Sequence, residues 1–383
     1  AVGYTDPELF DGVGEDWSVS FDGAVVLAGG QEITGLFGIQ DLGGQRVVAA
    51  SDLQLEFSVG AGASEERLFR LDAGQGLFLW SQDGMAGVAE FTFGLGSEVA
   101  GIELNGTDVG LAFNTTDGAV TEIAGTPVDL PAAGGQPYIR VSGAMELELT
   151  PPGVTWTGDF LFERTELSGS PVVTVGVQNL QFVFGADAGE VVSIQNGSGA
   201  FVIGADGIVG TATADVAVSV PVLDISGQFI VEVNLTGSGF LETVVTVGGV
   251  AVTIPVLPSG PYVRLSGTAV SLELLGEYGV TGNFTIEQSQ TQDGDQVVLV
   301  AITDGELGLG GMTGNLISAT GMDGVLIVTP DGAAGELTIS DLALAIPGIE
   351  LTGTFYLLTS NLPTALNETV TVGGVQEHYF LPA

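Results

Sequence analysis

Short runs of alternating polar and apolar residues fill most of the 383-residue chain. Such runs include residues 178–184 (QNLQFVF), 268–274 (TAVSLEL) and 336–340 (ELTIS). A period of two places one set of side chains on a buried face and the other in water, as in antiparallel strands. Gly, Asp, Asn and Pro separate the runs about every 8 to 12 residues, a spacing typical of all-β folds. We therefore predict an all-β chain. Residues 63–71 (ASEERLFRL) are the one candidate helix, with a charged hairpin tip as the alternative.

Several blocks recur in one order at one spacing. Residues 137–143 (PYIRVSG) match residues 261–267 (PYVRLSG), and the triplet GDF at 158–160 matches GNF at 282–284, so both pairs lie 124 residues apart. Asp-Gly pairs recur at 83–84, 206–207 and 331–332, each with another glycine three residues on. This indicates a tandem repeat. We predict three β units, a diverged 1–136, then 137–260, then 261–383, the last incomplete at its C-terminal end.

A shorter repeat lies inside the long one. Gly-x-Phe recurs at 227–229 and 353–355, and residues 172–176 (VVTVG) return at 244–248, which predicts two related halves of roughly 60 residues in each unit. Aspartate followed by glycine, between two apolar strands, predicts a hairpin turn in each copy. The recurring aromatic residues are predicted core anchors: Phe160, Phe229, Phe284 and Phe355.

The expected architecture is an elongated array of tandem antiparallel repeats. It is built either from β-sandwich-like modules or as one structure with cores fused across units. A β-solenoid of parallel strands is the alternative, although the repeat is long and lacks short rungs. A closed propeller of six half-units is the third arrangement. The strand that begins with Pro-Tyr in the earlier copies is missing after residue 383, which disfavours closure and suggests that a longer parent or a neighbouring chain supplies the next strand.

The net charge of the chain limits the kinds of molecule that it can bind. The chain has 47 acidic residues against six basic ones, all arginine, and a formal net charge of −41. Such a surface repels nucleic acid and anionic membrane and attracts divalent cations. No apolar run is long enough for a membrane-spanning helix. Cysteine is absent, which excludes disulfides and cysteine-ligated metals. We expect no nucleic-acid partner and no membrane span.

Catalytic chemistry has little to build on. His378 is the only histidine and lies close to the C-terminus, so a histidine-based triad or metal site depends on it. Glu163 and Glu287 each follow the repeated Phe by three residues, so the carboxylate recurs with the repeat, whereas a catalytic pair would be expected once. We interpret both as residues of a solvated strand face. The chain is not expected to be an enzyme.

Calcium binding is better supported by the sequence than catalysis. An asparagine followed by a glutamate recurs between strands, and aspartates lie at the predicted turns; their oxygens are suitable calcium ligands. No EF-hand loop or glycine-rich nonapeptide array is present, and Asx-turn capping explains the same residues without a metal. The candidate calcium ligands are Asp206, Asp331, Asn234, Glu242, Asn361 and Glu368.

Carbohydrate is a further candidate partner. Tyr138 and Tyr262 each precede an arginine by two residues and could stack on a sugar ring. Alternation places each tyrosine on the same face as its arginine, so a structural Tyr–Arg cross-strand contact, repeated in each unit, is the preferred interpretation.

Four blocks carry a family likeness: FVIGADGIVGT (201–211), PYVRLSGT (261–268), VTPDGAAGEL (328–337) and ETVTVGG (368–374). They resemble the tandem modules of very large bacterial extracellular and cell-surface proteins, over most of the chain from about residue 137. The resemblance implies an exported array of copies of one β module, attached to the surface or fibrous. It supplies no catalytic residues.

We therefore expect an extracellular structural or adhesive protein, such as a component of a fibre, stalk, sheath or surface layer. Its repeat ends are expected to self-associate, joining head to tail by β-strand addition. A calcium- or carbohydrate-binding surface module is the alternative function.

Overall fold

All regular structure in the described part of the chain is β-strand. The computed structural model describes residues 18–26, 32–42, 45–60, 65–133, 138–150, 153–186, 189–218, 223–274, 278–290, 296–311, 314–329, 331–345, 353–360, 362, 366–372 and 375–381. The all-β prediction is confirmed. The helix considered for residues 63–71 is wrong: residues 66–71 open a long strand, in which Leu68, Phe69 and Leu71 are buried.

The strands follow one order three times, six positions in a sheet and then a two-stranded hairpin. We call each series a unit. The first unit contains β1 (Ser18–Val26), β2 (Glu32–Leu42), β3 (Gln45–Val59), β4 (Glu66–Ser81), β5 (Gly84–Leu95), β6 (Ile102–Asn114) and the hairpin β7 (Val120–Ile123) with β8 (Thr126–Leu130). The second contains β9 (Tyr138–Leu149), β10 (Val154–Leu167), β11 (Ser170–Ala186), β12 (Gly189–Gly204), β13 (Gly207–Val218), β14 (Leu223–Ser226), β15 (Gln228–Asn234) and the hairpin β16 (Thr243–Val247) with β17 (Val250–Ile254). The third contains β18 (Tyr262–Leu274), β19 (Tyr278–Gln290), β20 (Gln296–Gly311), β21 (Gly314–Thr329), β22 (Gly332–Leu344), β23 (Phe355–Ser360) and the hairpin β24 (Leu366–Val372) with β25 (Val375–Leu381).

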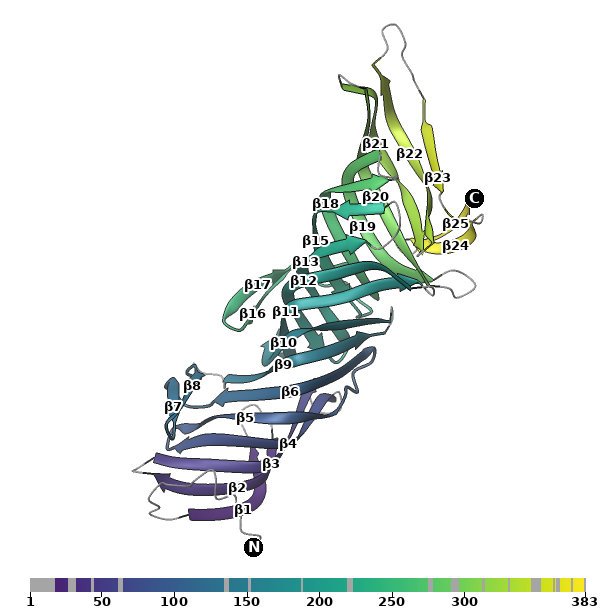
Figure 1. Cartoon of the computed structure of the whole chain (residues 1–383). Coiled ribbons are helices and arrows are strands. Elements are labelled where there is room, and N and C mark those ends of the chain that lie inside the picture. Colours follow the sequence, from purple (N-terminus) through teal and green to yellow (C-terminus); the bar gives the residue numbers. More distant parts are fainter. Residues whose placement is uncertain are drawn as a thin grey trace.

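One antiparallel sheet runs through all three units. Each strand pairs with the next in the order β1 to β6, β9 to β13, β15 and β18 to β23; β14 and β15 share one position, each pairing with part of β18. The strands stack along an elongated molecule, with β1 at one end and β22 and β23 at the other (Figure 1). The sheet does not close, so neither the propeller nor the parallel solenoid forms. The strand pairs β6–β9 and β15–β18 join the sheet on either side of the predicted unit limits at residues 136/137 and 260/261. The limits themselves stay a prediction.

The sheet also coils, so that β11, near the middle of the strand order, meets the strands six positions before and six positions after it. β11 packs against both β3 and β20; β4, β5, β6, β9 and β10 lie between the first two, and β12, β13, β15, β18 and β19 between the second two. The Gly60 N–H, just after β3, donates to the Pro171 carbonyl at 3.3 Å. Phe69 and Phe162, on β4 and β10, meet edge to face with ring centroids 5.3 Å apart. One repeat therefore corresponds to one turn of the coil.

Bulges at mid-strand bend the sheet. The Gly-x-Phe motif marks them: the pairing register shifts at Gly35, Gly158 and Gly282. The facing strands carry residues with positive φ at these shifts, Asn179 opposite Gly158 and Asp304 opposite Gly282. A Cβ on Gly282 would lie 3.0 Å from the Gly305 Cα, so a larger residue would push the two strands apart by a few tenths of an ångström. Because an extra residue bends and twists its strand, aligned bulges curl the sheet.

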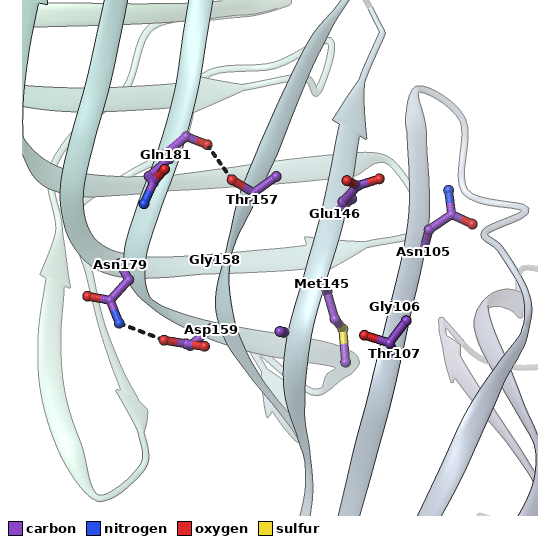
Figure 2. Close-up of a pocket in the computed structure, with 11 residues that line it drawn as sticks. Asn105, Gly106, Thr107, Met145, Glu146, Thr157, Gly158, Asp159, Asn179 and Gln181 are labelled. Atoms are coloured by element: carbon purple, nitrogen blue, oxygen red, sulfur yellow. Dashed lines mark hydrogen bonds between the residues drawn. The ribbon is translucent and has the colours of Figure 1, made fainter.

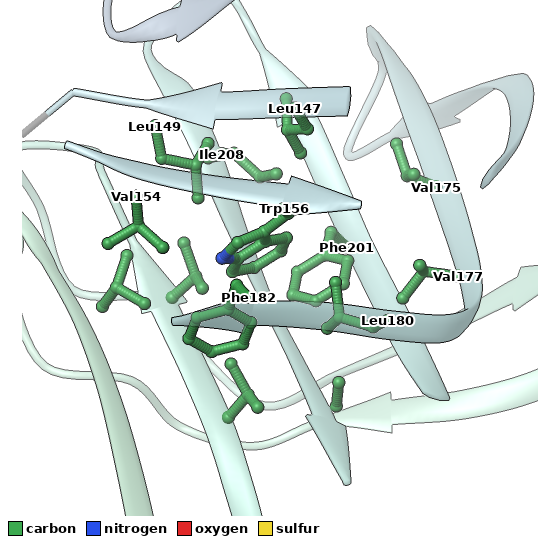
Figure 3. Close-up of a cluster of buried hydrophobic side chains, with 14 of the residues drawn as sticks. Leu147, Leu149, Val154, Trp156, Val175, Val177, Leu180, Phe182, Phe201 and Ile208 are labelled. Carbon is green, nitrogen blue, oxygen red and sulfur yellow. The ribbon is translucent and has the colours of Figure 1, made fainter. Parts of the chain in front are cut away.

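The coil encloses one continuous core. A single buried cluster reaches from Ile33 to Ile339, so the core of one unit continues into the next. Figure 3 shows part of it, where Trp156 packs against Phe182 and Phe201 at centroid distances of 5.4 and 5.0 Å. Three of the predicted anchors are almost fully buried, Phe160, Phe229 and Phe284, whereas Phe355 on β23 is half-buried.

The hairpins β7–β8 and β16–β17 fold onto the outer face of the sheet. Val245, Val247 and Ile254 of β16–β17 cover Val172 and Val202, and β7–β8 covers an equivalent patch around Val47 with Ile123 and Leu130. This explains why residues 172–175 (VVTV) are buried on both faces. The two VVTVG segments therefore have different roles, in the sheet and in the hairpin that covers it. The predicted half-unit repeat has no counterpart in the strand order.

The predicted Asp-Gly hairpin turns are confirmed in all three units. Gly84, Gly207 and Gly332 open β5, β13 and β22 with φ of 136°, 124° and 151°, a region open to glycine and strained for other residues. Each is paired with the last residue of the strand before the turn.

We expect Phe162→Ala to lower the free energy of unfolding by about 3–5 kcal/mol, because it opens a cavity between two turns of the coil. Hydrogen exchange should also accelerate in β4, which belongs to the preceding unit. Val183→Ala, an exposed aliphatic residue on β11, is the control and should change stability by less than about 0.5 kcal/mol. Protection of β4 that is unchanged in Phe162→Ala would contradict a shared core.

Candidate functional site

The candidate calcium ligands do not gather in one place. Asp206 and Asp331 are exposed on turns of different units, and Glu242 is exposed just before β16. Asn361 lies outside the described residues, and only the backbone of Glu368, in β24, is described. In the described ranges, no three His, Cys, Asp or Glu side chains form a group that could hold a metal ion. Calcium binding stays a prediction.

Asn234 is buried and holds the base of a hairpin. Its Nδ2 donates to the carbonyls of Ser238 and Pro258 at 2.9 and 2.7 Å. Its Oδ1 accepts from the N–H and the hydroxyl of Thr236, at 2.9 and 2.7 Å. Coordination of a cation by this oxygen would compete with both bonds. The Asx-turn explanation accounts for the geometry.

The same arrangement occurs one unit earlier. Asn114 is also fully buried, donates to the carbonyls of Gly118 and Pro131, and accepts from both donors of Thr116. The signal for this role is the Asn-x-Thr spacing at the end of a strand, 114–116 and 234–236. The sequence alone makes Asn234 a candidate calcium ligand, with Asx-turn capping as the explanation without a metal.

Each junction between units carries an arginine–glutamate pair. Arg140 on β9 lies opposite Glu163 on β10, with Nη2 and Oε1 3.2 Å apart. The other oxygen of Glu163 accepts from the N–H of Gly248, in the turn of the β16–β17 hairpin, at 3.0 Å. The pair therefore joins β9, the first strand after the junction, and β10 to the covering hairpin. The interpretation of Glu163 as part of a solvated face is wrong, because hairpin and arginine enclose it.

The second junction holds an extra carboxylate. Arg264 on β18 lies between Glu232 on β15 and Glu287 on β19 and forms its ion pair with Glu232. Burial raises the pKa of Glu287, which Arg264 opposes and Glu232 reinforces. Burial also raises the pKa of Tyr262 to about 12, again against the effect of Arg264. The Glu287 side chain is thus also largely shielded from solvent. Arg264 forms its ion pair with Glu232 and not with Glu287.

The repeated Tyr–Arg contact is confirmed, but it forms within one strand. The Arg140 guanidinium lies 5.3 Å from the Tyr138 ring centroid, and that of Arg264 lies 4.6 Å from Tyr262. Residues two apart share a face of a strand, so the ring covers its own arginine. The cross-strand partner is glutamate.

An open pocket of about 570 Å³ lies where the first two units meet, on β6, β9, β10 and β11 (Figure 2). Asp159 and Asn179 lie side by side in its wall, where the Asn179 Nδ2 donates to the Asp159 Oδ2 at 2.6 Å. Both flank the bulge, and similar pairs at other bulges are Asn196–Asp215 and Asn283–Asp304. No aromatic ring lines the pocket among the described residues, so sugar stacking has no platform there, and carbohydrate binding stays a prediction.

The two end strands of the sheet expose apolar side chains. On β23, Tyr356 and Leu358 are 62% and 53% exposed, and the strand carries no charged residue. On β1, Phe21 and Val26 are exposed. In the described part of the chain, β23 pairs only with β22 and β1 only with β2, so each offers a free row of backbone donors and acceptors.

Comparison of the chain with protein-family models, with curated proteins and with solved structures finds no significant match. The geometry therefore has to support any function on its own. Within the described ranges, the chain has no helix of the length and apolarity needed to cross a membrane.

We expect Asn234→Ala to destabilise the β16–β17 hairpin by about 2–3 kcal/mol, because it leaves the Thr236 N–H and two carbonyls without their partner. Hydrogen exchange of residues 243–254 is the measurement. Asn283→Ala, which loses one hydrogen bond at the surface, is the matched control. If calcium instead slows exchange in the wild type and not in the Asn234 variant, Asn234 is a metal ligand.

We expect Glu287→Gln to raise the melting temperature at neutral pH. A carboxyl group whose pKa is raised on folding contributes stability below its unfolded pKa and loses it as the pH rises through the folded pKa. The gain should vanish well below the ordinary glutamate pKa of about 4.3. Glu163→Gln weakens the ion pair with Arg140 and should lower the melting temperature at neutral pH. A gain for Glu287→Gln that is independent of pH would contradict this origin.

Proposed function

We propose that this protein is a non-catalytic structural element of the cell exterior, a stiff repeat segment of a fibre, stalk, sheath or surface layer. The observation that carries the proposal is the single coiled sheet, which passes from unit to unit with an unbroken ladder and a shared core. The junctions have the same construction as the unit interiors.

A sheet of this kind resists bending. Beads joined by linkers flex because few contacts cross each boundary. Here a bend at a junction would break backbone hydrogen bonds of β6–β9 or β15–β18 and expose core side chains such as Val141 and Leu265. Each further unit would add length at constant width.

Composition supports a place outside the cell. A formal net charge of −41 keeps neighbouring molecules soluble and apart at low salt, and acidic surfaces concentrate divalent cations. The likeness to tandem modules of bacterial surface proteins points the same way. Exported modules with a core of this size need no disulfide, and the chain has no cysteine.

The structural role is tested by particle shape. We compare the chain with a version in which residues 137–260 are duplicated in line, by small-angle scattering and electron microscopy, with and without calcium. A straight particle that lengthens at unchanged width is expected. The same duplication with a glycine–serine linker between the copies is the flexible reference. Bent particles with variable angles, like that reference, would contradict a stiff element, and detection of the protein only inside its cells would contradict the location.

A further inference from the structure

We propose that β23 of one molecule binds β1 of a second copy of this chain, and that the added strand continues the coil in the register of the two internal junctions. The proposal rests on the structural function above and identifies the partner. It concerns β1 and β23, the two end strands of the sheet. Each has an exposed edge, unlike the internal junction strands β6, β9, β15 and β18, which are paired on both sides.

β23 occupies the same position in its unit as β6 and β15. The glycine three residues after each Asp-Gly pair provides the alignment: Gly87 pairs with Phe113, Gly210 with Val233 and Gly335 with Thr359. In the first two units the strand at this position also pairs with the first strand of the next unit.

β1 occupies the same position as β9 and β18. The phenylalanine of the Gly-x-Phe motif provides the alignment here: Phe160 pairs with Gly143 of β9, and Phe284 with Gly267 of β18. Phe37 of β2 pairs with Phe21 of β1 in the same way.

The two alignments fix one register. At the internal junctions, Gly110 pairs with Ser142, and Ile230 pairs with Ser266. The residue of β23 equivalent to Gly110 and Ile230 is Tyr356, and the residue of β1 equivalent to both serines is Ser20. Tyr356 should therefore pair with Ser20 of the second copy.

The burial of β23 fits a missing neighbour. Phe229 and Val231 on β15 are fully buried, whereas the equivalent Phe355 and Leu357 on β23 are half-buried. A second copy would also bring its β3 six positions beyond β20, where β20 itself packs on β11 and β11 on β3. The joint would thus extend the core as well as the ladder.

The charge of the chain decides when this joint forms. Two copies of −41 each repel at low ionic strength, over a distance that salt shortens. The contacting strands carry little of that charge, none on β23 and only Asp22 on β1. Charged residues or prolines on an edge strand usually prevent it from pairing with other molecules, and β23 has neither. Association should therefore strengthen as salt or divalent cations are added.

Disulfide trapping tests the register, because the chain has no cysteine of its own. Chains with Tyr356→Cys and chains with Ser20→Cys are mixed in high salt and oxidised. Directly opposed residues of an antiparallel pair have Cα atoms about 4.5–5.5 Å apart, within reach of a disulfide. We expect a mixed dimer, and a ladder of oligomers when one chain carries both cysteines.

Two further pairs calibrate the trap. Ile230→Cys with Ser266→Cys in one chain reproduces the joint internally and should close an intramolecular disulfide. Tyr356→Cys with Val19→Cys in separate chains is slipped by one residue from the expected register and should not cross-link. Leu358→Lys should abolish the mixed dimer, whereas Leu241→Lys, at an exposed site outside β23, should leave it unchanged.

Three results would overturn the proposal. Self-dimers of Tyr356→Cys in place of mixed dimers would mean that two β23 edges meet. Equal trapping of the slipped pair would mean that the ends touch without register. A chain that stays monomeric at every salt and protein concentration would mean that no second copy binds, while the particle-shape measurement on that monomer still tests the structural function separately.

Discussion

The structure depends on one constraint, which is that every backbone donor and acceptor of a long antiparallel sheet needs a neighbouring strand. An isolated sheet of this length would leave one face in water and twist into a ribbon. This sheet instead coils, so that its inner face becomes a core shared by β3, β11 and β20 and their neighbours. Hydrogen bonds along the ladder and apolar contacts between successive turns thus stabilise each other.

The sheet can coil only because its strands bend, and the β-bulges produce these bends. Five of the residues held with φ between 50° and 54° are Asp52, Asn179, Asn196, Ala269 and Asp304, and each lies where the pairing register shifts. Asn and Asp tolerate this conformation better than other residues with side chains, which gives their frequency here a backbone reason. Pairs such as Asn179 with Asp159 then bridge strands across the bend. These asparagines and aspartates thus have a role in shaping and bridging the bends.

The polar groups that the structure buries serve the same architecture. Asn114 and Asn234 hold the hairpins that cover the outer face, and the Arg140–Glu163 pair joins one of those hairpins to a unit junction. These groups lie at boundaries between elements, where a backbone ladder alone would leave a gap. They are anchors for packing rather than an arrangement around a substrate. Only at β1 and β23 does the described ladder present unpaired edges.

The sequence by itself determined the strand class, the period near 124 residues and the Asp-Gly turns, because alternation and turn chemistry act over a few neighbouring residues. Three of the four phenylalanines that it predicted as core anchors are buried, Phe160, Phe229 and Phe284. The sequence did not determine that β11 contacts β3 and β20, since coiling depends on bends that accumulate over six strands. Glu163 and Glu287 were misread for the same reason, because an alternating pattern assigns a residue to a face but says nothing of what covers that face. A hairpin and an arginine from the neighbouring strand cover one of them, and only the tertiary structure decided that.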